Sequence, residues 1–111
     1  MKAQDFRLVY ITCKDQNEAK HLSQKLLEHR LVACTNILGE IASFYWWKGR
    51  IQNELEVTLI AKSRKDKVDD LIKMTKKHHS YQCPCIVTLE LQEGNPDYLT
   101  WLEEQLSEPV T

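Results

Sequence analysis

A row of four aromatic residues constrains the fold of this chain more than any other feature. Phe44, Tyr45, Trp46 and Trp47 follow one another in a stretch with the composition of a β-strand. Neighbouring residues of a strand point to opposite faces of the sheet, so the core of one small domain can bury only half of these side chains. The other half must be covered by another surface or remain as an exposed apolar patch.

The segment with these aromatics is predicted to be one arm of a long β-hairpin. The two arms run from about Ala33 to Ser63, and the Lys-Gly-Arg sequence at 48–50 supplies the turn. Strands average about five or six residues, whereas these arms could exceed ten. The aromatics could form a local cluster closed by a C-terminal helix through Tyr98 and Trp101. They could instead lie at a contact between subunits, where aromatic residues are enriched, and we favour this second interpretation.

The rest of the chain is predicted to alternate between strands and helices. Apolar runs indicate further strands at 6–12 and 86–91, and apolar residues at helical spacing indicate helices over about 15–29, 68–75 and 96–106. The order is therefore strand, helix, strand, strand, helix, strand, helix. Such an order is typical of a ferredoxin-like α+β sandwich, in which helices cover one face of an antiparallel sheet, here with an extra C-terminal helix.

Capping residues mark where these helices begin. Asp15 is predicted to cap the first helix, with Glu18 as its capping-box partner. The second helix is expected to be capped near Ser63 or Asp66. Pro96 suits the first turn of the last helix, because its missing N–H has no partner there in any case.

Length and charge limit the function classes. The 111 residues predict one domain spanning 1–111, with an ordered core of about 6–106. Fifteen basic and sixteen acidic residues give a net charge of −1, which disfavours nucleic-acid binding because such domains are usually basic. No apolar run approaches the roughly 20 residues of a membrane span, and the N-terminus lacks a secretory signal pattern. We therefore expect a cytoplasmic protein.

The four cysteines are expected to be reduced thiols, since no secretory signal is recognisable. Cys13 and Cys34 are interpreted as small, buried apolar residues. A bridge between Cys83 and Cys85 would have to close across Pro84 alone, against the geometry that disulfides require. Glycine-rich phosphate loops and the motifs G-x-S-x-G, HExxH and CxxC are absent from the sequence, so no enzyme class is indicated.

One segment near the C-terminal third has the chemistry of a metal site. His78, His79, Cys83 and Cys85 lie within it, and imidazole and thiolate are good ligands for copper and zinc. Adjacent histidines on a helix are about 100° apart and are poorly placed to chelate one ion together. His79 follows Val68 by about three helical turns and should face the domain, so a packed, hydrogen-bonded His79 is the alternative. A site shared between subunits would remove the objection from spacing.

Five segments, in their order and spacing, resemble the CutA divalent-ion-tolerance family. They are 33–37 (ACTNI), 43–49 (SFYWWKG), 56–62 (EVTLIAK), 79–84 (HSYQCP) and 94–101 (GNPDYLTW), within a match from about 9 to 101. The resemblance implies a CutA-like, ferredoxin-like subunit in a homotrimer whose interface is built by the long hairpin. It also implies a role in tolerance of, or response to, divalent metals such as copper. The family's trimers are similar to those of PII signalling proteins, which implies binding and signalling and not catalysis.

The resemblance also implies metal ligands. Copper ligands proposed in some members of the family correspond to His78 and His79. Ser80 stands where the family usually has a proline, and Cys85 stands where it usually has a glutamate. A thiolate in place of a carboxylate favours Cu(I) or Zn(II). We therefore predict that His78, His79 and Cys85 are ligands of copper or zinc.

Four functions follow from this reading, in decreasing order of support. The first is a trimeric, non-enzymatic binding protein for divalent metal such as copper. The second is a PII-like module that binds a small anion or metabolite in clefts between subunits. The third is an oligomeric scaffold that assists another protein, a partner that the sequence does not identify. The fourth is a thiol redox enzyme that uses Cys83 or Cys85.

Overall fold

The structure is a computed structural model that describes residues 2–109. Its four strands form one antiparallel sheet in the order β2-β3-β1-β4. The strands are β1 (Phe6–Cys13), β2 (Cys34–Trp47), β3 (Arg50–Arg64) and β4 (Ile86–Glu90). This topology confirms the ferredoxin-like α+β architecture predicted from the order of the elements.

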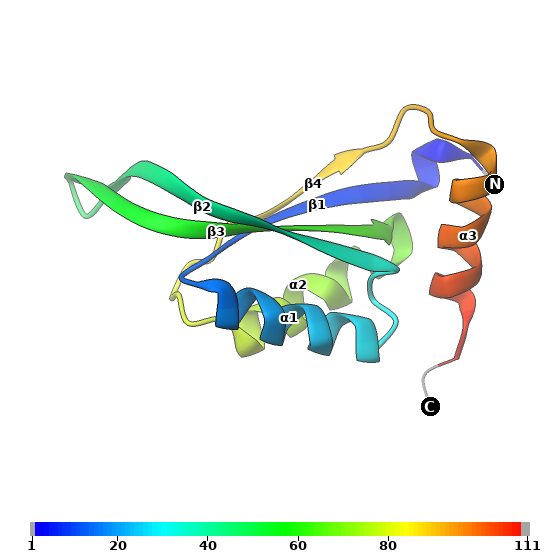
Figure 1. Cartoon of the computed structure of the whole chain (residues 1–111), viewed down its shortest axis with the longest axis horizontal. Coiled ribbons are helices and arrows are strands. Elements are labelled where there is room, and N and C mark those ends of the chain that lie inside the picture. The colour runs from blue at the N-terminus through cyan, green and yellow to red at the C-terminus, as the bar shows by residue number, and fades with distance from the viewer. Residues whose placement is uncertain (1, 110–111) are drawn as a thin grey trace.

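In the described part of the chain, three helices accompany the sheet. Helices α1 (Gln16–Glu28) and α2 (Val68–His78) cover one face of it, and α3 (Pro96–Ser107) stands at the end opposite the hairpin tip (Figure 1). Short 3-10 turns, η1 (Ala3–Asp5) and η2 (Lys65–Lys67), precede β1 and α2. Within residues 2–109, no helix is long and apolar enough to cross a membrane.

The predicted helix caps are correct for α1 and α3 and wrong for α2. The Asp15 side chain accepts a hydrogen bond from the Glu18 N–H at 2.8 Å, and Pro96 lies in the first turn of α3. Strand β3, however, continues to Arg64. Ser63 therefore lies inside the strand, where its hydroxyl donates to the Leu31 carbonyl at 2.6 Å. No side chain caps α2, because a 3-10 turn leads directly into it.

The main core lies between the sheet and the helices α1 and α2. Its fully buried side chains come from β1, α1, β3 and α2, and they include Val9, Ile11, Leu22, Leu26, Leu59 and Leu71. A second cluster of Phe6, Leu102 and Leu106 packs α3 against the start of β1. The apolar side chains at helical spacing in α1 and α2 thus pack against the alternate apolar side chains of β1 in one layer.

Strands β2 and β3 extend well beyond this core as a hairpin (Figure 1). Their pairing runs from Cys34 with Lys62 to Trp47 with Arg50, with one register shift between Leu38 and Glu40. Gly39 does not break the strand, because a β-bulge between Leu38 and Glu40 absorbs it. The turn at 48–49 has positive φ angles of 51° and 75°, the backbone of a two-residue hairpin turn.

The aromatics of the hairpin stay exposed in a single chain. Each of the four at 44–47 keeps more than a third of its surface accessible, and Trp46 is 72% exposed. Helix α3 lies at the other end of the sheet (Figure 1), where Tyr98 and Trp101 stack on each other with ring centroids 5.6 Å apart. The local cluster considered from the sequence is therefore excluded, since the two groups do not meet.

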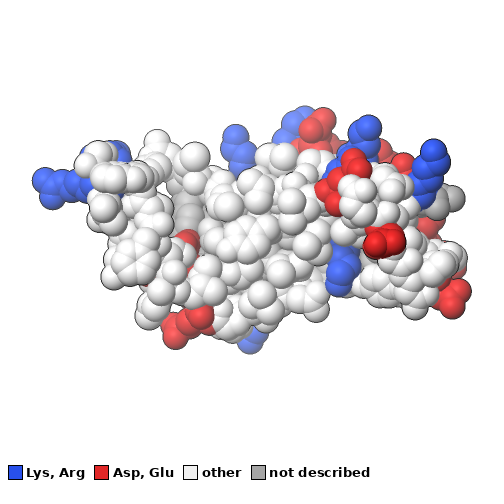
Figure 2. Space-filling view, turned by 90° about the horizontal axis from the view of Figure 1, so that it is seen from above, with Lys and Arg blue, Asp and Glu red and all other residues white. Residues whose placement is uncertain are grey.

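Within the described residues, no helix covers the face of the sheet opposite α1 and α2, here called the outer face (Figure 1). Val87 and Leu89 of β4 lie on it, opposite Tyr10 and Leu8 of β1, and are 53% and 61% exposed. The view of this side in Figure 2 shows uncharged side chains across its middle, with most charges toward the rim. A broad apolar surface of this kind normally contacts another molecule.

The turn at the hairpin tip gives a direct test of the fold. Gly49→Ala is expected to lower the free energy of unfolding by about 1 kcal/mol, because a Cβ at positive φ approaches the following carbonyl oxygen too closely. Gly39→Ala is the matched control, since its added Cβ meets nothing within 4 Å and its backbone has no positive φ. Urea denaturation of both variants measures the difference, and equal losses would contradict the turn geometry.

Candidate functional site

The three predicted metal ligands lie in three different surroundings. His78 is the last residue of α2, and its ring contacts that of His21. His79 turns into the core, and Cys85 precedes β4 beside a groove. Within residues 2–109, one group of three histidine, cysteine and acidic residues has ligand atoms that all lie within 4.8 Å of one another. It contains neither His78 nor Cys85. One chain therefore does not bring the three predicted ligands together.

His79 has the buried, hydrogen-bonded surroundings that the helical spacing indicated. Its side chain is 0% exposed. Its Nε2 lies 2.8 Å from the Thr12 carbonyl oxygen, and its Nδ1 lies 3.0 Å from the Tyr81 backbone nitrogen. The partners assign a neutral ring in which Nε2–H donates and Nδ1 accepts. Both nitrogens are in use, so a metal ion would have to displace one of these bonds.

The carboxylate of Glu18 lies next to this ring. Its Oε1 accepts from the Lys14 N–H at 2.9 Å, and its Oε2 accepts from the Ser80 N–H at 2.9 Å. Burial by itself raises the pKa of Glu18. The hydrogen bonds from Ser80 and Lys14 outweigh burial and leave the pKa below its ordinary value. Glu18 is therefore ionised at neutral pH, although its side chain is only 6% exposed.

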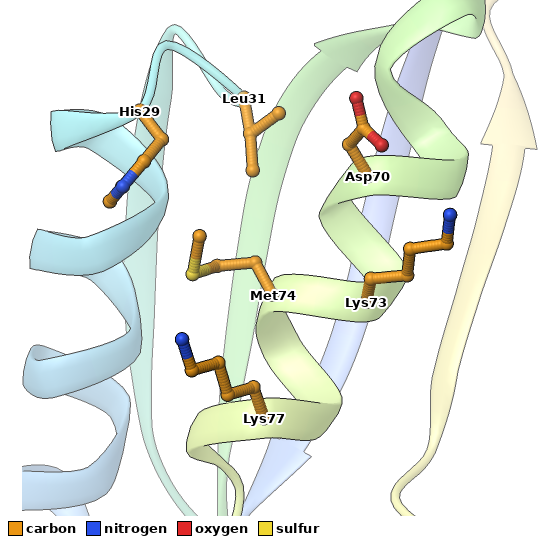
Figure 3. A pocket seen from close by; sticks show the side chains of 6 residues that line it. All are labelled: His29, Leu31, Asp70, Lys73, Met74 and Lys77. Carbon is orange, nitrogen blue, oxygen red and sulfur yellow. The ribbon is translucent and has the colours of Figure 1, made fainter.

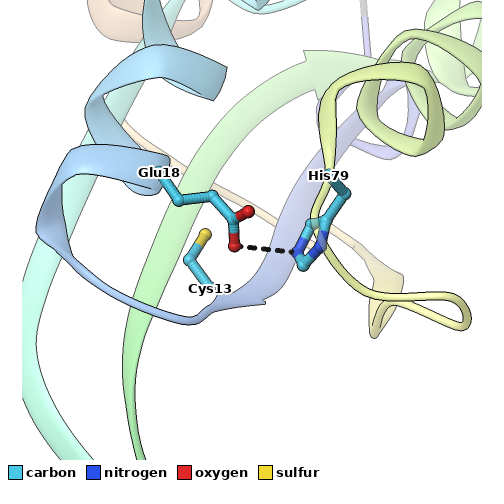
Figure 4. A group of neighbouring side chains, drawn as sticks. All are labelled: Cys13, Glu18 and His79. Atoms are coloured by element: carbon cyan, nitrogen blue, oxygen red, sulfur yellow. Dashed lines mark ion pairs between the residues drawn. The ribbon is translucent and has the colours of Figure 1, made fainter.

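Cys13 completes the compact group that contains Glu18 and His79 (Figure 4). Burial, followed by the nearby carboxylates of Glu18, Glu56 and Asp15, raises the pKa of the Cys13 thiol to about 12. A thiol binds metal as the thiolate, so this one is poorly suited to do so at neutral pH. The group is better explained as a structural junction, which joins the end of β1, the start of α1 and the end of α2.

The sequence contained only part of the signal for this junction. Glu18 was expected to form a capping box with Asp15, but its carboxylate bonds the N–H of Lys14, one residue earlier. Cys13 was expected to be a buried apolar residue, and it is. Nothing in the local pattern indicated that the carboxylate would also reach Ser80, a contact between segments far apart in the chain.

A groove of about 780 Å³ lies along the hairpin and the 81–85 segment. Its lining includes the aromatics at 44–47, the carboxylates of Glu54 and Glu56, and the thiols of Cys83 and Cys85. Tyr81 donates a hydrogen bond from its hydroxyl to the Glu56 carboxylate at 2.8 Å. The groove thus combines apolar walls with two thiols and two acidic groups.

Strand β3 has two buried polar residues at and next to this groove. Glu56, which lines it, and Thr58 are only 6% and 2% exposed. Tyr81 contacts Glu56 and satisfies its carboxylate, so the buried charge has a partner. Desolvation and Glu56, offset in part by a hydrogen bond with Thr12, raise the pKa of Cys85, so metal binding there must displace a proton.

All four cysteines, which lie within the described residues, are free thiols as expected. Cys34 was interpreted as buried and apolar, but it is only partly buried and has polar neighbours. Its Sγ lies 3.4 Å from the Tyr98 hydroxyl and 3.6 Å from the Lys62 Nζ. This position results from the pairing of Cys34 with Lys62 across β2 and β3, on the face that α3 approaches.

Comparisons with known proteins agree with this fold and add a family. A family profile described as CutA1 divalent ion tolerance protein matches residues 7–105. The divalent-cation tolerance protein CutA of Pyrococcus horikoshii is 40% identical over 98 residues, which cover 88% of this chain and 95% of that protein. The CutA homolog of Xenopus laevis is 35% identical over 99 residues, 89% of this chain. The chain spans 66% of the Xenopus protein and 57% of the rice chloroplastic CutA 1.

Solved structures show the same architecture. The crystal structure of CutA1 from Ehrlichia chaffeensis superposes with a TM-score of 0.88 at 30% identity and covers 95% of this chain and 98% of its own. The structure of the periplasmic divalent cation tolerance protein CutA from Archaeoglobus fulgidus superposes with a TM-score of 0.89 at 35% identity. It covers 92% of this chain and 99% of its own.

The junction at Glu18 predicts a dependence of stability on pH. The pKa of Glu18 is lower in the folded chain than its ordinary value of 4.5, so its contribution is present above about pH 4.5 and is lost as pH falls through the folded value. Glu18→Gln should lower the free energy of unfolding at pH 7 by about 1–3 kcal/mol, because two backbone N–H groups lose a charged acceptor. It should also lose less stability than the wild type between pH 5 and pH 3.

Glu28→Gln, on the exposed side of the same helix, is the control for this experiment. Glu28 pairs with Lys25 at 3.9 Å on the surface, and exposed pairs contribute little. Urea denaturation at several pH values measures both variants. A Glu18→Gln protein with wild-type stability and an unchanged pH profile would show that the junction is not a stabilising element.

Proposed function

The chain belongs to the CutA1 divalent ion tolerance family, and on that premise we propose that it acts as a homotrimeric, non-enzymatic binding protein for divalent metal ions. Copper and zinc are the ions in question, because the available ligands are thiols and imidazoles. The role that follows is tolerance of, or response to, such metals. The proposal rests on two features, the exposed outer face with its hairpin and the thiols of the adjoining groove.

The exposed apolar side chains of the hairpin and the outer face support self-association. Phe44, Trp46 and Ile51 are each at least 65% exposed in the single chain, and all three lie near the hairpin tip. Obligate interfaces between identical chains are larger and more apolar than transient ones. Burial of these side chains against copies of the same surface would account for a hairpin that extends so far beyond its own core.

The groove supports metal binding by thiols. Cys83 and Cys85 line it together with Glu56, and thiolates prefer Cu(I) and Zn(II). In a trimer, a neighbouring chain could supply further ligands, which would meet the requirement for three or four donors. His79 is a less suitable ligand than the sequence indicated, because both its ring nitrogens already have partners.

The size of the groove favours one alternative, a PII-like role. Small-molecule sites usually enclose about 300–1,000 Å³ with mostly apolar walls and a few polar groups, and this groove of about 780 Å³ has that composition. A small metabolite bound between subunits would then be the ligand, and metal binding would be secondary. A thermal-shift screen against metabolites separates this alternative from the main proposal.

The proposed assembly can be tested directly. Light scattering of the purified protein at micromolar concentration should give about three times the chain mass of 13.0 kDa. Trp46→Ala should weaken the trimer, because truncation of a large buried aromatic costs about 3–5 kcal/mol. Leu27→Ala on α1 is the control, since Leu27 is an exposed apolar residue away from the outer face. A wild-type protein that is monomeric under these conditions would disprove the assembly.

The second prediction concerns the groove thiols. Zinc titration of the reduced protein by calorimetry should show affinity that falls about tenfold or more in Cys85→Ser, because zinc binds thiolate far better than hydroxyl. Cys34→Ser is the matched control, a partly buried thiol outside the groove. Melting temperatures of both variants verify their folds. Equal zinc affinity in Cys85→Ser and the wild type would exclude Cys85 as a ligand.

A further inference from the structure

His21 and His78 bring two imidazole rings together on the helical side of the molecule. Their ring centroids lie 5.3 Å apart, and the ring planes are inclined by 70°. His21 is exposed on α1, and His78 is the partly buried last residue of α2. The two helices pack against the same face of the sheet (Figure 1), so the core fixes the distance between the two backbones.

The other two histidines have different partners. Both ring nitrogens of His79 are hydrogen-bonded in the junction. The Nδ1 of His29 lies 2.9 Å from the carbonyl oxygen of Lys25, about 12 Å farther along α1 than His21. In Figure 3, His29 lies beside a hollow of about 380 Å³, at the opposite end from Lys77. Within the described residues, His21 and His78 are the only two histidines whose rings contact each other.

The spacing of these rings matches that of two imidazoles on one metal ion. Two imidazoles on a tetrahedral zinc have ring centres about 5 Å apart, since each Zn–N bond is about 2.0–2.1 Å and the ring centre lies about 1.1 Å behind the nitrogen. The observed 5.3 Å therefore requires no movement of either helix. Only side-chain torsions must change for a nitrogen of each ring to face a common ion.

The local electrostatics have two opposing parts. The positive charges of Lys25 and Lys77 act on the ring of His78. The same lysines repel a divalent cation. The C-terminal end of α2 partly compensates, because the terminal carbonyl groups of a helix have partial negative charge.

We propose that His21 and His78 form a two-imidazole site on the helical face for a divalent ion of the late first transition row, such as Zn²⁺ or Cu²⁺. Water would complete the coordination, which makes the ion exchangeable. This site differs from the ligand set predicted from the sequence, because the partner of His78 is His21 and not His79. It deepens the proposed metal binding and rests on it, but it is separate from the groove thiols. Its position on the helical face keeps it accessible when the outer face is covered.

Zinc binding to protein with Cys83→Ser and Cys85→Ser in the background tests this site without the groove thiols. His21→Gln and His78→Gln are each expected to weaken zinc binding by about tenfold or more, because loss of one ligand removes the intramolecular advantage of the second. His29→Gln is the matched control and should bind as the background protein does. Calorimetry gives the affinities. The ¹⁵N shifts of the ring nitrogens on zinc addition identify the ligands, and melting temperatures verify each fold.

Each outcome of this experiment decides a separate point. Loss of affinity in both variants, with ring-nitrogen shifts only at His21 and His78, supports the site. Loss in His78→Gln alone overturns it, since His78 would then use another partner. Zinc binding that requires Cys83 and Cys85 and shifts no imidazole also overturns it, while the proposed metal function stands. Absence of zinc binding in the wild type removes both.

The lysine beside the pair provides a second test that a purely structural role of the histidines would not affect. Lys25→Gln should strengthen zinc binding roughly threefold at low ionic strength, because one repelling positive charge is removed. The gain should shrink as salt is added. Lys48→Gln, at the hairpin tip, is the control and should leave affinity unchanged. Affinity that does not respond to Lys25→Gln places the ion elsewhere and contradicts the proposal.

Discussion

The rest of the structure depends on the hydrogen bonds of one buried carboxylate, that of Glu18. It accepts hydrogen bonds from the backbone at Lys14 and Ser80, and so joins the start of α1 to the end of α2. A buried charge is costly unless its oxygens are hydrogen-bonded, so neither segment can move without loss of stability. A hydrogen bond from His79 to the Thr12 carbonyl oxygen joins the end of β1 to the same group. Tyr81 is thereby placed where its hydroxyl reaches Glu56.

This junction separates two surfaces with different chemistry. On one side, the segment with Cys83 and Cys85 borders the groove beneath the hairpin, where thiols and acidic groups meet aromatic walls. On the other side, α2 ends with His78 against His21. A single sheet with helices on one face leaves its other face uncovered by this part of the chain. The proposed assembly surface and the proposed histidine site therefore lie on opposite faces of the sheet.

The candidate site could be predicted only in part, and the residues show why. The inward direction of His79 follows from helical spacing, which is a local property. The partner of His78 does not, because His21 belongs to another helix and reaches it only when both helices pack on the sheet. Cys85 and Glu56 also come together only in the folded chain. They line the same groove because β3 and β4 both pair with β1. Ligand types were evident in the sequence, whereas their grouping was not.

The sequence by itself determined the order of the elements, the ferredoxin-like topology, the length of the hairpin and the cap at Asp15, because propensity, periodicity and capping act over a few neighbouring residues. The tertiary structure alone decided that Glu56 is buried, that α2 begins without a side-chain cap and that Glu18 bonds Ser80. It also decided which histidines meet. These outcomes depend on how whole layers pack, and the distance between residues far apart in the chain has no local signal from which it could be read.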